Sequence, residues 1–529
     1  MKKVLFCMFV CSVMIASCSD DFLNRSPQSE LSSSGFYKTQ TDMNMAVLSC
    51  YQRLRSLYNG NYFRLGEIRS DNTSYSWLAG NPINERGIDE FAQPLLENNG
   101  FLRDVWNDSY NGILRCNLVL KYIGDATFTQ EPLRVQYEAE ARFLRALYYF
   151  WLNRIFGGEG LDGQLLGVCQ VETVITQAEA YEIGRASLQS IYDLIVADLT
   201  FAESNLPGSY AASDKGRATK ASASGMLAKV YMFMAGFPLN KGNEYYTKAI
   251  QQMDKFYSAY PEIKLAPTYQ HLFKSPHNQT LYTKNSVESI FEIQYKKGTS
   301  GEQCSSPWNN NFAPRFQVGV LVVGDAGGEN APTDDMSAAY DYGDPRKYVS
   351  MRDGWVNPST GAFNNDKFVC KYYDIATSGS NNDNNWIELR LADLYLLHAE
   401  ALVRTGGDKS KALGFVNQIR ERARVTAGDP AITDAPGDLL LSYQLADFAD
   451  DNALLLAIEK ERRVELAFES HRWFDLVRTG RAKDVMTAQQ TAQFGSLTWS
   501  DNALRYPIPE QVMQSNPEKI IQNKGYTQK

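Results

Sequence analysis

The sequence predicts a mainly α-helical protein, in which tetratricopeptide-like helix pairs form a scaffold that carries a long loop-rich insertion with short strands. Two observations predict this fold class. Apolar residues recur at helical spacing in the first and last parts of the chain, whereas residues 261–385 gather Gly, Pro, Asn and Ser instead. The 529-residue chain is 44% hydrophobic, which provides enough apolar side chains for a large core.

The clearest helix covers residues 137–155. Its apolar positions alternate in steps of four and three, so they share one helical face, and Gly157-Gly158 ends the pattern. The irregular period and the long stretches between helix pairs favour a scaffold over a regular solenoid. Similar spacing predicts further helices over about 188–202, 223–234, 391–401 and 409–424.

The insertion, residues 261–385, separates an N-terminal helical region, 36–260, from a C-terminal one, 386–529. Short apolar runs at Ser289–Ile293 and Val318–Val322 predict brief strands between turns. Long irregular segments of folded proteins are more often functional than idle, so we expect ligand contacts in this part of the chain.

Residues 1–17 are typical of a lipoprotein signal peptide. Lys2 and Lys3 precede an apolar run, Val4–Ile15, which is too short to span a bilayer as a mature helix. Ile15-Ala16-Ser17-Cys18 resembles a bacterial lipobox. We therefore expect cleavage before Cys18, acylation of its thiol, and an anchor and linker over residues 18–35. Ordinary secretion, with Cys18 a chance residue, is the alternative.

Composition and motifs argue against several function classes. The formal net charge of −8 argues against nucleic acid, whose binders present a basic face. None of the four histidines has metal-ligand spacing, and no nucleophile elbow, phosphate loop or dinucleotide fingerprint occurs. We expect no enzyme and no cofactor, and we expect His398 to be a hydrogen-bonded core residue. The cysteines after Cys18 are scattered, which predicts small buried side chains rather than disulfides.

One oxygen-rich cluster invites a metal-binding interpretation. Asn381, Asp383, Asn385 and Glu388 could together hold calcium, which prefers carboxylate and amide oxygens. Trp386 stands where a calcium loop of the EF-hand kind needs Gly, so we favour a solvated turn.

The C-terminal region is rich in residues of opposite charge. Arg462 can pair with Glu465, and Glu469 with Arg472, at spacings of three residues. A catalytic interpretation would make these carboxylates general acids and bases, but we favour a partly buried ion network that orders helix packing. The same interpretation applies to Arg390 with Asp393 and Glu400.

Several motifs follow one another in a fixed order along the chain. They are Trp106–Ile113, Glu138–Phe150, Gly216–Ala221, Leu389–Tyr395, Glu461–Glu469 with Arg472–Arg478, and a closing Tyr506–Pro509. In this order, and together with the lipobox, they resemble the SusD/RagB family of nutrient-binding outer-membrane lipoproteins. The resemblance covers the chain from about Asp21 to its C-terminus.

This resemblance implies a function in nutrient uptake. It implies a lipid-anchored protein on the cell exterior that captures oligosaccharide or polysaccharide for a TonB-dependent outer-membrane channel of the SusC type. Asp20 and Asp21 resemble the signal that exports such lipoproteins to the surface. Three alternatives remain open, namely a peptide-binding protein of the RagB kind, a surface glycoside hydrolase, and a scaffold without a ligand of its own.

Sugar-binding sites need exposed aromatic rings, on which sugar faces stack, beside short polar side chains that bond the hydroxyls. Two loop regions and one further Trp have this mixture, and the resemblance implies a ligand site in loops of these two broad regions. The alternative is that these residues pack onto the scaffold. The candidates are Asp71, Asn72, Tyr75 and Trp77; Trp308, Asn309, Phe312 and Arg315; and Trp355.

Overall fold

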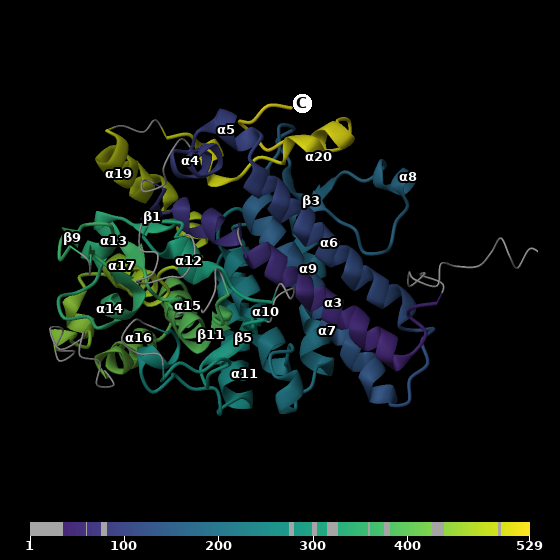
Figure 1. The fold of residues 1–529 in the computed structure, drawn as a ribbon, viewed down its shortest axis with the longest axis horizontal. Helices are drawn as coiled ribbons and strands as arrows, with labels where there is room; N and C mark the ends of the chain where they lie inside the picture. The colour runs from purple at the N-terminus through teal and green to yellow at the C-terminus, as the bar shows by residue number, and fades with distance from the viewer. Residues whose placement is uncertain are drawn as a thin grey trace, which may run out of the picture.

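The computed structural model describes residues 35–59, 61–75, 82–274, 280–298, 304–314, 326–357, 360–374, 381–425, 439–495 and 499–528. Its scaffold consists of long helices that pack on one another; those before residue 206 lie on the right of Figure 1, and those after residue 390 lie on the left beside the green insertion. The predicted mainly α-helical class is therefore confirmed. The scaffold helices are α3 (Gln40–Tyr58), α6 (Gly100–Tyr122), α7 (Glu131–Phe156), α9 (Leu188–Asn205), α10 (Lys220–Ala235), α11 (Asn243–Ala259), α15 (Leu391–Arg404), α16 (Lys409–Arg424) and α17 (Asp451–Glu465).

The helices predicted from spacing are confirmed as α7, α9, α10, α15 and α16. Their ends follow from local chemistry. The Asp408 side chain accepts from the Lys411 amide at the start of α16, and Thr39 and Asp42 form a capping box at the start of α3. Helix α7 ends at Gly157, and almost every residue from Ala139 onward is buried, because other helices cover it on all sides.

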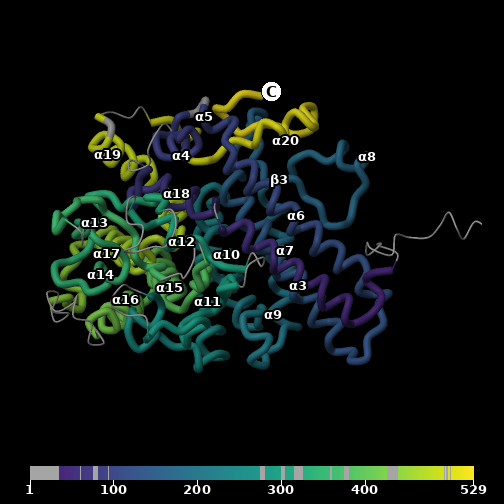
Figure 2. The backbone as a smooth tube through the Cα atoms, viewed as in Figure 1, coloured from purple at the N-terminus to yellow at the C-terminus, as the bar shows by residue number. Residues whose placement is uncertain are grey.

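Shorter helices fill the space around the scaffold. Helices α4 and α5 lie beside the C-terminal helices α19 and α20 in Figure 2, where the Gln490 amide donates to Asp89 and the Thr527 amide to Glu97. The short helices are α4 (Ile83–Asp89), α5 (Gln93–Glu97), α8 (Gln177–Ala180), α12 (Trp308–Phe312), α13 (Asp334–Ala339), α14 (Arg346–Ser350), α18 (Arg472–Arg478), α19 (Ala482–Phe494) and α20 (Glu510–Ser515). The described residues also form the π-helical turn η1 (Arg64–Ile68) and the 3-10 turns η2 (Ala212–Asp214), η3 (Tyr269–His271), η6 (Leu445–Asp447) and η7 (Asp501–Leu504).

The strands of the described residues are short and pair antiparallel, and the predicted strand at Ser289–Ile293 is confirmed as β5. It pairs with β11, so the insertion and the C-terminal region share a small sheet. The predicted run Val318–Val322 lies outside the described residues, and the insertion also holds α12–α14, which we did not predict.

The strands are β1 (Thr73–Ser74), β2 (Gly158–Glu159), β3 (Leu165–Cys169), β4 (Arg185–Ser187), β5, β6 (Ala331–Pro332), β7 (Met351–Arg352), β8 (Trp355–Val356), β9 (Phe363–Asn364), β10 (Phe368–Val369) and β11 (Trp386–Arg390). Their pairs are β1–β6, β5–β11, β7–β10, β8–β9 and the three-stranded β2–β3–β4.

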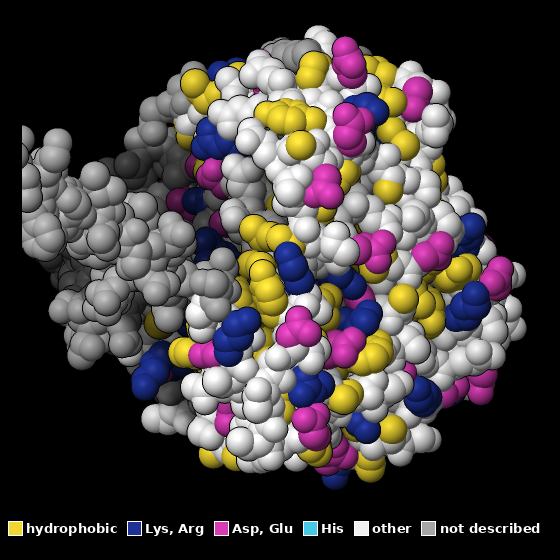
Figure 3. Space-filling model, turned by 90° about the vertical axis from the view of Figure 1, so that its right-hand side faces the viewer, with side chains coloured by type: hydrophobic (Ala, Val, Ile, Leu, Met, Phe, Trp, Pro, Cys, Tyr) yellow, Lys and Arg dark blue, Asp and Glu magenta, His cyan; other side chains and the backbone are white. Residues whose placement is uncertain are grey.

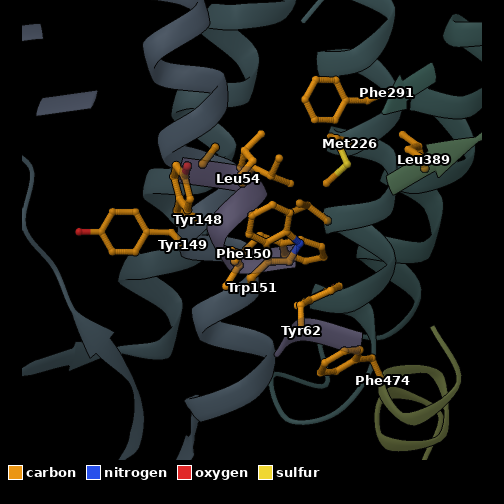
Figure 4. Packing of buried hydrophobic residues seen from close by; sticks show 14 of the residues in the cluster. Leu54, Tyr62, Tyr148, Tyr149, Phe150, Trp151, Met226, Phe291, Leu389 and Phe474 are labelled. Carbon is orange, nitrogen blue, oxygen red and sulfur yellow. The ribbon is translucent and has the colours of Figure 1, made fainter. Parts of the chain in front are cut away.

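Large aromatic residues form the centre of the main core. Trp151 on α7 lies among Tyr58, Tyr62 and Tyr148 at ring centroid distances of 4.9, 5.6 and 5.8 Å, as Figure 4 shows for Tyr62 and Tyr148. Burial of such rings is the largest stabilising contribution of a core this size. The carboxylate of Glu388 accepts from the Tyr58 hydroxyl at 2.5 Å and from the Trp151 indole at 3.3 Å, which satisfies a charge placed inside this core.

The predicted ion network exists and is buried, but its pairings differ from those predicted. Arg462 binds Asp393 and Asp475 rather than Glu465, and Glu465 binds Arg346, Arg390 and Arg422. Helix α17 ends at Glu465, and Phe468 and Ser470 take positive φ, so residues 469 and 472 do not share a helical face. Glu469 therefore binds Lys371 and Arg390, while Arg472 binds Asp71 and Glu459. Among the described residues, Arg390 forms an ion pair with neither Asp393 nor Glu400.

His398 is fully buried as expected, but its expected hydrogen bonds are not found among the described residues. Its ring packs on Tyr257 and Phe415, and its closest carboxylate oxygen, on Asp254, lies 3.9 Å away. Burial lowers the pKa of His398 to about 4, against a smaller opposing effect of Asp254, so the imidazole is neutral at pH 7. The described cysteines form no disulfide with one another, and Cys50, Cys116, Cys169 and Cys370 are buried, as predicted.

Candidate ligand-binding surface

The first loop region predicted to bind ligand pairs with another segment of the insertion. Strand β1 pairs with β6, which joins Thr73 to Pro332 and Ser74 to Ala331. The Thr333 amide donates to the Asn72 carbonyl at 3.0 Å, and its hydroxyl donates to the Asp71 carbonyl at 2.7 Å. The loop at residues 71–75 therefore lies against the insertion, in which the second predicted loop region, Trp308–Phe312, forms α12.

The π-helical turn η1 places one arginine at the junction. The guanidinium of Arg64 lies 4.7 Å from the ring centroid of Phe63 and 4.6 Å from that of Phe101. Its Nη2 contacts a Glu329 oxygen at 2.5 Å, and Glu85 is 4.0 Å away. Burial raises the pKa of Glu329, and Arg64 offsets part of this effect. The arrangement is a cation held between rings, partly open to solvent at Phe101.

Asp71 and Asn72 are buried and fix the loop to the C-terminal region. The Asp71 carboxylate accepts from Arg472 Nε and Nη2 at 2.7 and 2.8 Å, and Arg463 lies 3.1 Å away. Burial alone would raise the pKa of Asp71, but the two guanidinium groups outweigh it and hold the pKa at about 2. The Asn72 amide bridges Glu67 and Arg463, at 3.1 and 2.9 Å.

Tyr75 keeps part of its ring exposed at the end of the described loop. Its hydroxyl donates to Glu90, and its amide donates to Asp89 at 3.2 Å. Burial raises the pKa of Asp89 to about 7, although hydrogen bonds from Ser74 and the Tyr75 amide partly offset it. The hydroxyl of Tyr75 is thus fixed by protein groups, while its ring remains accessible.

The three sequence candidates on α12 are buried. Trp308 packs against Tyr295, Trp386 and Tyr372 at ring centroid distances of 4.6, 5.2 and 5.5 Å. Phe312 packs on Phe63 at 4.9 Å, and the Asn309 amide donates to the Asp374 carbonyl at 2.7 Å. Other side chains therefore cover the rings of Trp308 and Phe312, on which a sugar would have to stack.

Trp355 lies apart from this junction, on the β8–β9 hairpin. Val356 pairs with Phe363 across the strands, and their side chains are 57% and 63% exposed. The ring of Phe363 covers Gly354, where an added Cβ would lie 2.4 Å from a ring carbon. Trp355 is half-buried beside Asn364. The hairpin carries aromatic rings on both faces, because Phe363 shares one face with Val356 and Trp355 shares the other with Asn364.

Sequence reasoning missed Phe363, Arg64 and Phe101. Phe363 stands before Asn364-Asn365, the same aromatic and amide mixture that singled out the other loops, so this signal was present in the sequence. Arg64 and Phe101 also follow such mixtures, at residues 58–63 and 98–100, but only the tertiary structure joins the two segments. The candidates Trp77 and Arg315, and the lipidation candidate Cys18, lie outside the described residues.

The oxygen-rich cluster at 381–388 does not converge on one point. Asn381 accepts from the Gly298 amide, Asp383 from Lys284 and the Lys297 amide, and Asn385 from the Tyr295 amide. Glu388 faces the core instead, because its partners are Tyr58 and Trp151. Within the described ranges no group of three or more His, Cys, Asp or Glu side chains is placed to hold a metal ion.

The chain matches two family models, one in each half. Residues 21–232 match the model described as starch-binding associating with outer membrane, and residues 309–526 match the model of the SusD family. The SusD-like protein P25 of Formosa agariphila is 26% identical over 97% of this chain and 98% of its own. A SusD-like protein of Bacteroides ovatus is 27% identical over 90% of this chain and 82% of its own.

Solved structures share the fold over nearly the whole chain. A SusD homolog from Bacteroides thetaiotaomicron has a TM-score of 0.74 at 23% identity and covers 95% of this chain and 100% of its own. A laminarin-binding SusD-like protein has a TM-score of 0.72 at 24% identity, with 93% and 100% covered. Surface glycan-binding protein A from Bacteroides thetaiotaomicron, in complex with laminarihexaose, has 0.73 at 21% identity, with 92% and 100% covered.

The scaffold side of the molecule carries a mixed surface. Figure 3 shows hydrophobic side chains in small groups among charged side chains of both signs. Helices α3, α6 and α7 expose Met45, Leu48, Leu114 and Val135 by 41–46%. In the part of the chain that is described, the helices lack the length and apolar character needed to cross a membrane.

Proposed function

Because the chain belongs to the SusD-like family, we propose that it is a cell-surface glycan-binding lipoprotein that captures oligosaccharide or polysaccharide and delivers it to a TonB-dependent outer-membrane channel of the SusC type. Two proteins of similar structure support a glycan ligand, because one is described as laminarin-binding and the other is in complex with laminarihexaose. The proposal requires neither a catalytic step nor a cofactor.

The observation that carries this proposal is the exposed aromatic ring of Phe363 on the β8–β9 hairpin. Phe363 is 63% exposed over Gly354, while Trp355 and Asn364 lie on the opposite face of the hairpin. A sugar ring can stack on either aromatic ring, and the Asn364 amide lies beside Trp355, where it can bond hydroxyls. Each stacked ring contributes about 1 kcal/mol, so affinity should be weak for one sugar and should rise with chain length.

Of the residues predicted from sequence, we propose Trp355 and Tyr75 as ligand contacts, since both keep exposed ring surface. We also retain Trp77 and Arg315 as proposed contacts. Asp71, Asn72, Trp308, Asn309 and Phe312 instead support the loops from beneath, because they are buried and bonded to other parts of the chain.

For the channel we propose contact through the helical side formed by α3, α6 and α7. The apolar groups exposed there lie on α3, which begins about 20 residues after the proposed lipid anchor at Cys18, and on its neighbours. Ligand would then be presented by the loop-rich side. Charged substitutions at Met45 and Leu48 should abolish copurification with the channel and leave glycan binding unchanged.

Native gels cast with a panel of polysaccharides, laminarin first, test glycan binding by the mature chain. We expect retardation by one glycan, and its loss in Trp355→Ala and Phe363→Ala. Tyr181→Ala is the matched control, because Tyr181 is 50% exposed at the C-cap of the short helix α8, outside the hairpin. Thermal unfolding of each variant shows whether the fold is retained.

Unchanged mobility in every gel contradicts polysaccharide binding, and an oligopeptide panel then tests the peptide alternative. Retardation that persists in both hairpin variants keeps the function but rejects the hairpin as its site. Release of reducing ends from the bound glycan contradicts a purely binding role.

A further inference from the structure

A solvent-open cavity of about 130 Å³ lies between helices α15, α17 and α18, and its walls are unusually rich in arginine. It is distinct from the β8–β9 hairpin, and its chemistry does not depend on glycan binding there. Its volume is roughly four times the 30 Å³ that one water occupies in the liquid, so a small polyatomic ion fits with water. Six arginines line it, namely Arg404, Arg462, Arg463, Arg472, Arg478 and Arg481.

The deeper arginines are held by carboxylates. Arg478 binds both oxygens of Glu400 at 2.8 and 2.6 Å, and Arg472 binds both oxygens of Asp71. These paired guanidinium groups form a rigid wall, because bidentate pairs fix the orientation of both partners. Burial alone would raise the pKa of Glu400, but the neighbouring arginines, Arg478 first, outweigh burial and lower the pKa to about 2.

The arginines at the opening retain unused donors. Among the described residues, Arg404 makes one side-chain hydrogen bond, from Nε to Glu400 at 2.7 Å, and its two terminal nitrogens make none. Arg481 donates from Nε to Glu459 at 3.3 Å, and its Nη1 lies 3.7 Å from Asp484, beyond hydrogen-bond distance. Their side chains are 26% and 36% exposed. Both residues line the cavity, so their remaining planar N–H groups are available to an oxyanion there.

Among the described residues, seven cations around the cavity face seven carboxylates, two of which are largely exposed. Lys229 and the six arginines have side chains at most 36% exposed, and five carboxylates, on Asp71, Asp393, Glu400, Glu459 and Asp475, are at most 20% exposed. The side chains of Asp335 and Asp484 are 55% and 76% exposed, so solvent screens their contacts with Arg463 and Arg481.

The neighbouring ion network is buried more deeply. Its five cations, all at most 4% exposed, face five carboxylates that are just as buried, and Asp341, 32% exposed, pairs with Arg420 at its edge. The cavity differs because Arg404 and Arg481 are partly exposed and two of the carboxylates beside it are screened by solvent. An anion from solution can therefore bind to these arginines without displacing a buried carboxylate.

We propose that this cavity binds an oxyanion, namely sulfate, phosphate or a carboxylate, between Arg404 and Arg481 at its opening. The group can come from a free ion or from a substituent of a sulfated or uronic-acid-containing polymer. Both sources present the same planar or tetrahedral oxygens to the guanidinium groups, and the experiment distinguishes them.

Isothermal titration of the mature chain with sodium sulfate and with sodium phosphate, at constant ionic strength set by sodium chloride, tests the site directly. We expect saturable binding that falls by about tenfold or more in Arg404→Gln/Arg481→Gln, because two charge-assisted contacts are lost. Lys519→Gln/Lys524→Gln is the matched control, since it removes two exposed cations that each pair with one carboxylate. Sulfate stabilises proteins generally, so thermal shifts count only where wild type and variant differ.

Leu456→Glu provides an independent variant that leaves the ion pairs intact. Leu456 lines the cavity and is 39% exposed, so the new carboxylate would repel an anion without disturbing the core. Loss of sulfate binding in this variant supports the proposal even if the double arginine variant fails to fold. Absence of binding by both ions to wild type, or equal binding to all variants, overturns it.

Competition identifies the source of the oxyanion. A sulfated or uronate oligosaccharide that displaces sulfate, where the neutral oligosaccharide does not, supports recognition of a charged polymer. Displacement by none of the sugars supports a free ion. These outcomes are separable from the hairpin test, because Trp355→Ala and Phe363→Ala should leave sulfate binding unchanged.

Discussion

Asp71→Asn distinguishes a ligand contact from a structural ion pair. The side chain keeps its shape and loses its charge, so the variant mimics protonated Asp71. In the folded protein the pKa of Asp71 is about 2, against an ordinary value of 3.8. Because one pKa unit corresponds to about 1.4 kcal/mol, the charged form stabilises the fold by roughly 2–3 kcal/mol at pH 7. We expect the variant to lose this amount.

The pH dependence of this difference follows from the direction of the shift. The folded-state pKa lies below the unfolded value, so the stabilisation is present above about pH 4 and is lost as the pH falls through about 2. The difference between wild type and variant should be constant from pH 5 to 8 and should fall to roughly half at pH 3.

Denaturant unfolding of both proteins across this pH range measures the effect. Asp353→Asn is the matched control, since Asp353 pairs with Lys347 at 2.7 Å but is 46% exposed, and its loss should cost at most about 1 kcal/mol. The reasoning is refuted if Asp71→Asn is as stable as wild type yet loses glycan binding, which would make Asp71 a ligand contact.

Three further substitutions follow from burial. Trp308→Ala should destabilise the fold by about 3–5 kcal/mol in denaturant unfolding, because a fully buried ring is removed, and a stable variant would contradict its core position. Glu67→Gln should leave the free energy of unfolding unchanged near pH 4 and raise it by about 3 kcal/mol above pH 7. The reason is that burial raises the pKa of Glu67 from 4.5 to about 7, so its ionisation weakens the fold as the pH rises. A difference between variant and wild type that does not change with pH would reject this. Gly112→Ala should lower thermal stability by about 1–3 kcal/mol or more, because its Cβ would lie 2.2 Å from a ring carbon of buried Tyr148, and an unchanged melting temperature would show that this contact relaxes freely.

The long helices could be predicted because their information is local. Helix α16 begins at an Asp408 cap and continues to Arg424 with apolar residues in line, and α7 ends where Gly157 follows its last apolar turn. Strand β5 was predictable from its short apolar run. Its partner β11 was not, because the pairing of Phe291 with Leu389 joins residues that are almost 100 apart, and no local pattern encodes it.

The ligand-binding residues were harder to predict because exposure is a tertiary property. Both Trp308 and Trp355 have polar loop residues nearby in the sequence. Trp308 nevertheless contacts three core rings, whereas Trp355 lies on an open hairpin. The sequence shows which residue types gather in a loop. Which face of the loop is exposed to solvent depends on how α3, β5 and β11 are arranged, and the loop sequence does not encode that arrangement.

Asp71 illustrates the same limit for charge. An Asp followed by Asn, Thr and Ser is typical of a sugar-binding loop, but its two arginine partners lie about 400 residues away. Those partners belong to the motif Glu461–Arg478, which also forms the wall of the arginine-rich cavity. The loop and the cavity are therefore built by one set of ion pairs, in which Asp71 neutralises part of the positive charge that would otherwise face the cavity. A buried carboxylate that balances its neighbours and a carboxylate that binds a ligand have the same local sequence, and they differ only in where the compensating charge comes from.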